Sequence, residues 1–449
     1  MEKEKKLSEA KKLQKELLMD NKNSGLIMTD EEMATADKFC EGYAKFLDTG
    51  KTEREAATYS IALAKEHGYT EFEIGKKYNP GDKFFYNNRG KAVILAIMGT
   101  EPIEKGVRIT AAHIDSPRVD LKQRPLYEDS ELALFKTHYY GGIKKYQWTA
   151  MPLALHGVII KANGETVEVC IGENDSDPVF CITDLLPHLA ADQMKRTLSE
   201  GIKGEELNIL IGSRPFRDDE ASDKVKLAII KLLNEKYGIV EADFMSAELE
   251  LVPSAKARDV GFDRSMIGAY GHDDRVCAYT ALMATLDTKA PKTTAITILA
   301  DKEETGSDGN TGLRSAYLKY FIADLAAPFG VEARTVLQNS DCLSADVNAA
   351  FDPTFPEVLE RRNAAFLNYG VVVTKFTGSR GKSGTSDASA EFVGKVRSLL
   401  DRNNIIWQTA ELGKVDQGGG GTVAAYIANL DVDVIDVGVP VLSMHAPFE

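Results

Sequence analysis

The sequence predicts an α/β protein in which a mostly parallel sheet is sandwiched by helices and interrupted by an inserted, β-rich domain. Beyond Pro253, apolar strands alternate with helices, and near-continuous apolar strands are typical of a parallel sheet covered on both faces. Between about residues 120 and 253 the pattern changes to hairpin-like segments. We therefore expect one domain built from residues 1–119 and 254–449, and a second domain inserted over residues 120–253.

The N-terminal part is expected to be mainly helical up to about residue 75. Residues 1–18 are charged and amphipathic, without the apolar core of a signal peptide. Two more helices are predicted over residues 30–48 and 51–68, the first starting at an acidic cap and the second ending on a glycine. Three strands follow, the first two joined by a tight turn at Asn88-Arg89-Gly90; they are expected at residues 83–88, 91–99 and 106–115.

The inserted region contains a hairpin signal, with Asn163-Gly164 as its turn. A helix is expected over residues 223–238 and a strand over residues 243–253. No cluster of candidate metal ligands occurs there. After the insertion the alternating elements resume. Helices are predicted at residues 273–287, 312–326, 386–404 and 422–430, and strands at residues 293–300, 334–341, 369–376, 408–412 and 432–439.

Composition excludes several classes of partner. The net charge is −14 over 449 residues, so the surface repels nucleic acid and anionic lipid. No apolar run approaches the roughly 18 residues that a membrane span needs. The five cysteines are scattered without a CxxC pair, which favours reduced thiols in a cytoplasmic protein over a thiolate zinc site or disulfides.

Histidine and carboxylate side chains follow the predicted strands of the larger domain. In open α/β sheets, ligands bind beyond the carboxyl ends of the strands, so these side chains are expected to gather at one edge. Five separate segments contribute to the set, which consists of His113 and Asp115, Asp273 and Asp274 before a helix, Glu303 and Glu304, Asp341 and Asp346, and His445.

Two histidines with several carboxylates suit Zn, Mn or Co. A pair of divalent ions about 3.5–4 Å apart needs a bridging carboxylate and about two further ligands for each ion. Asp273 is the candidate bridge. Asp346 with His113 would complete one ion, with Asp341 as the alternative aspartate. The second ion would be completed by Glu304 and His445.

Two carboxylates remain for other roles. Asp115, two residues past His113, would accept the imidazole N–H and fix its tautomer. Glu303 would be the general base beside the ions, a common arrangement in metal-assisted hydrolysis. Each of these motifs alone is more often a solvated turn or a helix cap. The prediction of a metal site depends on their occurring together after the strands of one sheet.

Another motif, GSRGKSG, suggests a phosphate-binding loop but lacks a required glycine, because Phe376 stands five places before Gly381. Its basic residues, with Lys375, remain candidates for contact with a peptide. In the inserted region, His188 is a candidate to reach the active site of a neighbouring subunit.

These motifs resemble one known family. AAHIDSPRVDLK, GHDDRVCAYTAL, DKEETGSDGNTG, SADVNAAFDP and SMHAPFE, together with YYGGI and ITDLLPHLA in the insertion, are similar to the aminopeptidase I / aspartyl aminopeptidase family of co-catalytic dizinc peptidases. The resemblance covers most of the chain and implies a zinc-peptidase-like catalytic domain. It also implies an inserted dimerisation domain and self-association into a tetrahedral dodecamer.

The resemblance implies a role for each residue. His113, Asp273, Glu304, Asp346 and His445 would be metal ligands, with Asp346 chosen over Asp341 because SAD matches the ligand motif. Glu303 would be the catalytic base and Asp115 the residue that orients His113. The implied substrates are peptides, cleaved one N-terminal residue at a time. Family members continue past MHAPFE into a closing helix.

One departure bears on specificity. Aspartyl-specific members carry histidines shortly after the ligand aspartate, where this chain has Ala349 and Asp352, and a further histidine near the position of Asp192. We therefore expect neutral or basic N-terminal residues to be preferred over acidic ones. The alternatives to an aminopeptidase are a dimetal carboxypeptidase or N-deacylase, and a non-catalytic binding protein on a peptidase fold.

Overall fold

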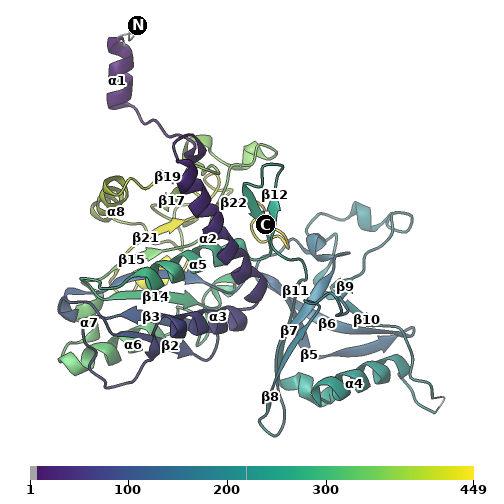
Figure 1. Ribbon diagram of the computed structural model, residues 1–449. Coiled ribbons are helices and arrows are strands. Elements are labelled where there is room, and N and C mark those ends of the chain that lie inside the picture. The colour runs from purple at the N-terminus through teal and green to yellow at the C-terminus, as the bar shows by residue number, and fades with distance from the viewer. Residues whose placement is uncertain (1–7, 219) are drawn as a thin grey trace.

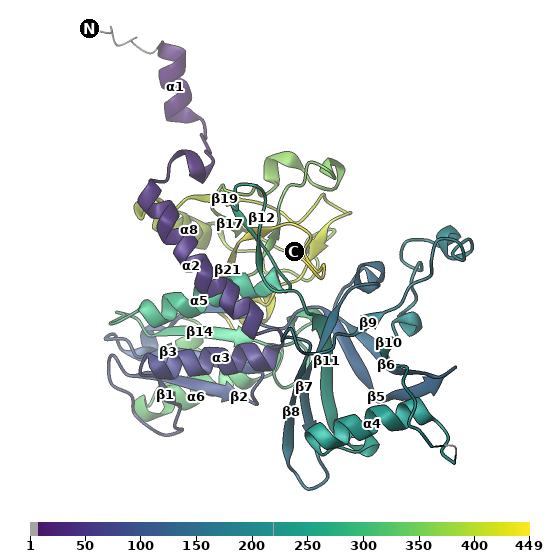
Figure 2. The same cartoon turned by 45° about the vertical axis from the view of Figure 1, so that its right-hand side comes forward.

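The computed structural model describes residues 8–218 and 220–449. The fold is α/β, with a large nine-stranded sheet and a separate seven-stranded sheet that lie in two distinct bodies (Figure 1). Figure 2 shows the two bodies meeting along a narrow junction near the ends of β11 and α3. None of the described helices has the length and apolar character needed to cross a bilayer.

The large sheet is mixed, with a parallel centre. Its four central strands, β14, β4, β15 and β21, run parallel to one another, while β3 and β17 on either side run antiparallel to them. In spatial order the strands are β1 (Thr70–Glu71), β2 (Lys83–Asn88), β3 (Ala92–Ile97), β14 (Ala295–Ala300), β4 (Arg108–His113), β15 (Asp341–Ser344), β21 (Asp433–Gly438), β17 (Val371–Thr374) and β19 (Trp407–Thr409).

Helices cover both faces of this sheet because alternate residues of its strands face opposite sides. In β3, Ile94 and Ala96 join the core on one face, and Val93, Leu95 and Ile97 join the core on the other. The first core contains α6 (Tyr317–Ala326), α7 (Ala333–Leu337) and α9 (Ala424–Ala428), and the second contains α2 (Asp30–Thr49), α3 (Glu53–Glu66) and α5 (His272–Asp287). The helix α8 (Ala390–Arg402) packs against β17 and β21.

The N-terminal elements form where the local signals place them. Thr29 and Thr52 each cap a helix through a capping box, so the first cap is a threonine that precedes the acidic residues. Arg89 and Gly90 both adopt positive φ between β2 and β3, as a two-residue hairpin turn requires. The first helix, α1 (Glu9–Leu17), contains no buried residue, and residues 1–7 of the predicted helix lie outside the described part of the chain.

One predicted strand is wrong. Residues 334–341 were expected to be extended, but α7 occupies most of the segment and β15 begins only at Asp341. A short run with two apolar residues, such as Thr-Val-Leu, does not distinguish a strand from a buried helical turn, and here Val336 and Leu337 face the core from a helix. The correction shifts the strand along the chain, so that Asp341 starts it and Asp346 lies just past its end.

All seven strands of the second sheet come from the segment between Arg118 and Pro253, and the chain leaves the large sheet after β4 to form it. Every pairing in it is antiparallel, and α4 (Lys224–Tyr237) contacts β5, β6 and β10. Its strands, in spatial order, are β8 (Thr166–Ile171), β7 (Leu153–Ile160), β11 (Ala247–Pro253), β5 (Arg118–Asp129), β6 (Leu132–Tyr140), β10 (Ile209–Gly212) and β9 (Cys181–Ile182).

Three short strand pairs complete the fold. They are β12 (Arg258–Val260) with β13 (Met266–Gly268), β16 (Asn348–Ala349) with β22 (Pro440–Val441), and β18 (Gly378–Ser379) with β20 (Gly419–Gly420). The pair β16–β22 lies directly beyond Asp346 and leads the chain toward His445.

Candidate metal centre

The register of the central strands brings the predicted site residues to one edge. His113, the last residue of β4, pairs with Ala300 at the end of β14, and Ser344 at the end of β15 lies beside Ala111. The segments that follow these strands therefore emerge side by side. Glu303 and Asp346 are carried on two of them.

Asp273 lies between the two histidines. Its Oδ1 is 3.1 Å from Nε2 of His113, and its Oδ2 is 3.1 Å from Nε2 of His445. Asp273 precedes the regular part of α5, because Asp273 and Asp274 have non-helical backbone angles and their peptide bond is cis. The two imidazoles come from residues more than three hundred positions apart and face opposite oxygens of one carboxylate.

The remaining predicted ligands surround this trio. Nε2 of His113 is 4.0 Å from Oδ1 of Asp346, and Nε2 of His445 is 3.6 Å from Oε1 of Glu304. Two groups of candidate ligand atoms share Asp273, each with its atoms within 4.8 Å of one another: His113, Asp273 and Asp346 form one, and Asp273, Glu304 and His445 the other. The assignment of these five side chains as ligands stays a prediction.

The two adjacent glutamates diverge on a tight turn. Lys302 adopts a left-handed conformation directly after β14, and residues 303–305 form one turn of 3₁₀ helix. The side chain of Glu303 is 17% exposed and that of Glu304 is 2% exposed. Oε2 of Glu303 is 3.8 Å from Nε2 of His113, so both carboxylates border the site but only Glu303 is open to solvent.

Asp115 stabilises this turn as well as facing His113. Its carboxylate oxygens accept the backbone N–H groups of Glu303 at 3.1 Å and Glu304 at 3.2 Å. Nδ1 of His113 is 3.0 Å from the backbone oxygen of Asp115 and 3.3 Å from its carboxylate. The sequence predicted the contact with the imidazole and missed the hydrogen bonds to the glutamate turn.

Asp341 lies at the opposite end of the strand. It starts β15, pairs in register with Arg108 and forms ion pairs with Arg108 and Lys395. Because β15 runs from Asp341 toward Asp346, only Asp346 reaches the edge with the histidines. Asp341 therefore lies at the wrong end of the strand to serve as the alternative ligand.

Burial and crowding of carboxylates dominate the electrostatics of the centre. Burial, reinforced by neighbouring carboxylates, raises the pKa of Glu303 to about 7 and raises the pKa values of Glu304 and Asp346 well above their usual range. Burial also opposes ionisation of Asp273, but hydrogen bonds with both imidazoles hold its pKa below the usual range. The centre is a buried site in which carboxylates outnumber the two imidazoles, and burial opposes their ionisation unless a cation is bound.

This donor set fits divalent cations. Oε1 of Glu304 is buried and accepts no hydrogen bond from any described residue. No described lysine or arginine forms an ion pair with Asp273, Glu303, Glu304 or Asp346. A buried carboxylate oxygen without a donor is costly unless something positive binds it, and imidazole with carboxylate is a donor set that zinc accepts.

Three contributors to the centre were not identified from sequence. The Tyr140 hydroxyl donates to Oδ2 of Asp115 at 2.7 Å, and Nδ1 of His445 donates to the backbone oxygen of Gly142 at 2.7 Å. Glu449 accepts the backbone N–H groups of Asp273 at 2.9 Å and His445 at 3.1 Å. The YYGGI motif gave a family signal but no reason to place it at the site.

Other candidates from the sequence lie elsewhere or are already paired. His188 is exposed on the second body. Lys375 and Lys382 both form ion pairs with Asp387. Oδ1 of Asp352 accepts the backbone N–H of Thr354 at 2.8 Å in a local turn.

Comparison with known proteins identifies close relatives. A family model described as aminopeptidase I zinc metalloprotease (M18) matches residues 46–449. The chain is 52% identical over 442 residues to a probable M18 family aminopeptidase 1 from Clostridium acetobutylicum, covering 97% of this chain and 95% of the relative.

Solved structures resemble the fold to different degrees. The structure is similar to the crystal structure of an M18 family aminopeptidase from Thermotoga maritima, with a TM-score of 0.92, 44% identity, and coverage of 96% of this chain and 95% of that one. A dodecamer structure of mApe1 from S. cerevisiae is 22% identical, with a TM-score of 0.72 and 91% coverage of each chain, and shows the fold alone.

Proposed function

This chain belongs to the aminopeptidase I (M18) family of zinc metalloproteases and is a metallo-aminopeptidase, and on that premise we propose that it uses two bridged ions and a glutamate base. The observation that carries the proposal is the position of Asp273 between the imidazoles of His113 and His445. A carboxylate shared in this way is what a two-ion centre requires of its bridging ligand.

In this proposal, five side chains hold the ions. His113 and Asp346 belong to one ion, Glu304 and His445 belong to the other, and Asp273 is shared between them. Zinc is the family's metal, and Mn or Co would accept the same donors. When bound, the ions would polarise the scissile carbonyl and increase the acidity of the attacking water.

Glu303 would act as the general base. It is the more exposed of the two adjacent glutamates and borders His113, so it can reach a water molecule beside the centre. Its carboxylate takes the proton from the attacking water and then gives it to the leaving amine. Asp115 holds the backbone of this glutamate turn and Nδ1 of His113, which keeps the base and the histidine in fixed relative positions.

Replacing Glu303 with Gln tests the base. Turnover should fall by several orders of magnitude, because the amide cannot accept the proton, while zinc content measured by atomic spectroscopy stays at the wild-type level. A free α-amine should also be required, so N-acetylated peptides should not be cleaved. Retention of activity by E303Q would remove Glu303 as the base, and cleavage of acetylated substrates would favour a deacylase or carboxypeptidase.

We expect neutral or basic N-terminal residues to be preferred. Asp352 adds negative charge after the ligand segment, and the nearby basic residues Lys375 and Lys382 are neutralised by Asp387. An acidic substrate side chain therefore gains no evident cationic partner from these residues. Comparing hydrolysis of Leu-, Lys- and Asp-amides tests this, and fastest cleavage of the Asp-amide would contradict it.

The assembly is also part of the proposal. Residues 120–253 would form an inserted dimerisation domain, and the chain would assemble into a tetrahedral dodecamer, as the dodecameric mApe1 structure suggests for a distant relative. Sedimentation of the zinc-loaded protein measures the assembly directly. A monomer at micromolar concentration would contradict this part of the proposal and leave the chemistry untouched.

A further inference from the structure

The segment Tyr140–Gly142, which consists of the last residue of β6 and the two glycines after it, brings the second body into contact with the metal centre. Three consecutive residues of this β6-end segment touch three different site residues. The Tyr140 hydroxyl donates a hydrogen bond to Asp115, and the backbone carbonyl of Gly142 accepts a hydrogen bond from His445. Gly141 lies so close to Glu304 that an added Cβ would be 3.1 Å from its Oε2. The proposed chemistry assigns no role to this segment.

Tyr140 completes the hydrogen bonding of a carboxylate that organises the site. Asp115 is fully buried. Oδ1 accepts the backbone N–H of Glu303, and Oδ2 accepts the backbone N–H of Glu304 and the Tyr140 hydroxyl. The hydroxyl therefore restrains the oxygen that holds the backbone of a proposed ligand. Loss of this donor leaves Asp115 freer to rotate and the glutamate turn less tightly held.

Arg118 restrains Tyr140 in turn. The two residues are direct cross-strand partners in β5 and β6, and the Arg118 guanidinium lies 4.0 Å from the centre of the Tyr140 ring. Such stacking is favourable, and it gains strength when water is excluded, as it is for the 7% exposed Arg118 side chain.

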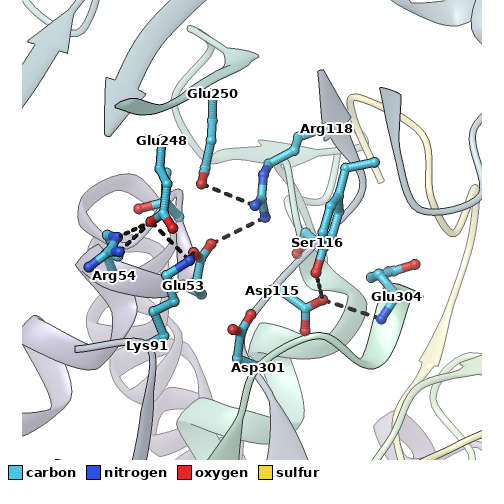
Figure 3. A network of polar contacts seen from close by, with 12 residues as sticks. Glu53, Arg54, Lys91, Asp115, Ser116, Arg118, Glu248, Glu250, Asp301 and Glu304 are labelled. Atoms are coloured by element: carbon cyan, nitrogen blue, oxygen red, sulfur yellow. Dashed lines mark hydrogen bonds and ion pairs between the residues drawn. The ribbon is translucent and has the colours of Figure 1, made fainter. Parts of the chain in front are cut away.

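Carboxylates from three elements fix the orientation of that guanidinium. Glu53 of α3 is 3.2 Å away, Asp120 of β5 is 2.9 Å away and Glu250 of β11 is 3.0 Å away. Figure 3 shows Arg118 between Glu53 and Glu250, close to the hydrogen bond that joins Asp115 to Glu304. A chain of direct contacts thus runs from the junction of the two bodies to the glutamate turn.

We propose that Tyr140 is a positioning residue for the metal centre, acting through Asp115, and that Arg118 is a positioning residue that acts through Tyr140. The second body then does more than mediate association, because it sets the geometry of the site within its own subunit. This inference rests on the proposed ligand set, since the restrained turn carries Glu303 and Glu304.

Tyr140→Phe tests the first step, because it removes one hydroxyl and keeps the ring that Arg118 covers. Loss of a hydrogen-bonding partner that orients metal ligands typically costs about 10- to 100-fold in metal affinity or activity. Because Tyr140 acts through Asp115 and not on a ligand directly, we expect a loss toward the lower end of that range. It should appear in zinc affinity, measured without substrate by competition with a chelator, or in kcat at saturating zinc, with KM nearly unchanged. Tyr139→Phe, the same change at the neighbouring, 39% exposed tyrosine, should match the wild type.

A double-mutant cycle tests the second step. Arg118→Lys keeps a positive charge among the three carboxylates but removes the planar group that stacks on Tyr140. If Arg118 acts through Tyr140, R118K lowers zinc affinity or kcat in the wild type and adds no further loss in the Y140F background. Equal losses in both backgrounds would overturn the role of Arg118, and a Y140F protein within twofold of wild type in both measurements would overturn the whole proposal.

Misfolding and failure of the underlying chemistry are both recognisable. Thermal unfolding of each variant shows whether the fold is retained, and Y140F remains informative if R118K does not fold. If E303Q keeps its activity, the proposed function fails whatever Y140F does. If E303Q is inactive and Y140F equals wild type, only the positioning role fails.

Discussion

The metal centre and a second cluster around His156 contain the same kinds of side chain but differ in what balances their charge. Glu55, His156 and Cys170 also bring potential ligand atoms within 4.8 Å of one another, at the junction of α3 with β7 and β8. His156 and Cys170 lie in the inserted segment, where the sequence predicted no cluster of candidate ligands, so that prediction is wrong. By residue type and spacing alone, this cluster could bind a metal as well as the groups around Asp273.

The charges of the His156 cluster are already satisfied. Nδ1 of His156 is 2.7 Å from Glu55 and Nε2 is 3.0 Å from Glu173, so both ring nitrogens face carboxylates. Glu173 also binds Lys51 at 2.7 Å and Lys256 at 2.5 Å. Burial opposes protonation of His156, but hydrogen bonds with Cys170, Glu173 and Glu55 raise its pKa to about 11, so the ring is a cation that the surrounding carboxylates balance.

The metal centre has no lysine or arginine among the described residues to balance its carboxylates. Although burial opposes it, hydrogen bonds with Asp115 and Asp273 raise the pKa of His113, and the hydrogen bond with Asp273 raises the pKa of His445 to about 10, so without metal the positive charge there comes from these two rings. Its carboxylates face two imidazoles and one another, and Glu304 keeps a buried oxygen without a hydrogen-bond donor. The comparison shows that ligand-type residues in proximity are not sufficient for a metal site. An unbalanced negative charge that the surrounding protein leaves uncompensated is the more informative feature.

The largest effect is expected from Asp273→Asn. The amide presents one oxygen where the carboxylate presents two, so it cannot be shared between two cations in the same way. We expect zinc content to fall and activity to drop by several orders of magnitude, as measured by atomic spectroscopy and amide hydrolysis. Full activity with a full complement of zinc in D273N would show that Asp273 is not the shared ligand.

A smaller and different effect is expected from His156→Gln. Removing the central cation breaks its contacts with Glu55 and Glu173, but Glu173 keeps Lys51 and Lys256 and the Glu55 side chain is 29% exposed, so neither charge is left buried without compensation. We therefore expect a loss of about 1.5–3 kcal/mol of unfolding free energy, the range for hydrogen bonds to charged groups. Zinc content and kcat should remain at wild-type values, because the cluster is not part of the metal centre. Denaturant titration measures the unfolding free energy. Loss of zinc from H156Q with unchanged stability would show that the His156 cluster, and not only the centre around Asp273, binds metal.

Much of this arrangement is predictable from the sequence because strand ends of a parallel sheet share an edge. That rule predicted the gathering of His113, Glu304 and Asp346, while Asp273 was included because it stands before a helix; the α/β class followed from the alternation of apolar strands and helices. The strand prediction failed at residues 334–341, where the two apolar residues Val336 and Leu337 suit a helical turn as well as a strand. Misplacing this strand also left Asp341 as an alternative ligand. The start and direction of β15 decide which aspartate reaches the edge with the histidines, and that is Asp346.

The contacts supplied by the second body could not be predicted in this way. Tyr140 and Gly142 reach the centre because β6 ends there, and that depends on how two sheets are oriented relative to each other. No local pattern encodes the orientation. The ion pairs that satisfy His156 are equally non-local, since Lys51, Glu173 and Lys256 come from separate segments.

The smallest expected effect is a difference in pH dependence between the two clusters. The pKa of Glu173 is lowered from its ordinary value of 4.5 to about 2, because its hydrogen bonds with His156, Lys256 and Lys51 outweigh burial, so its contribution to stability is present above pH 4.5 and lost as the pH falls toward 2. The pKa of Glu303 is raised by burial from 4.5 to about 7. Without metal, its contribution is therefore present below pH 4.5 and lost as the pH rises through 7.

Between pH 5 and 7 the zinc-free protein should thus lose stability as the pH rises, and bound zinc should remove that slope by stabilising the ionised carboxylates. Scanning calorimetry of zinc-free and zinc-loaded protein at several pH values in this window measures the difference. H156Q should show the same difference in slope between zinc-free and zinc-loaded protein as wild type, because the contribution of His156, which is lost as the pH rises from 6.5 toward 11, is the same with and without zinc. Identical slopes with and without zinc would mean that the protein itself balances the charge of the metal centre. The metal centre would then not differ from the His156 cluster in this respect.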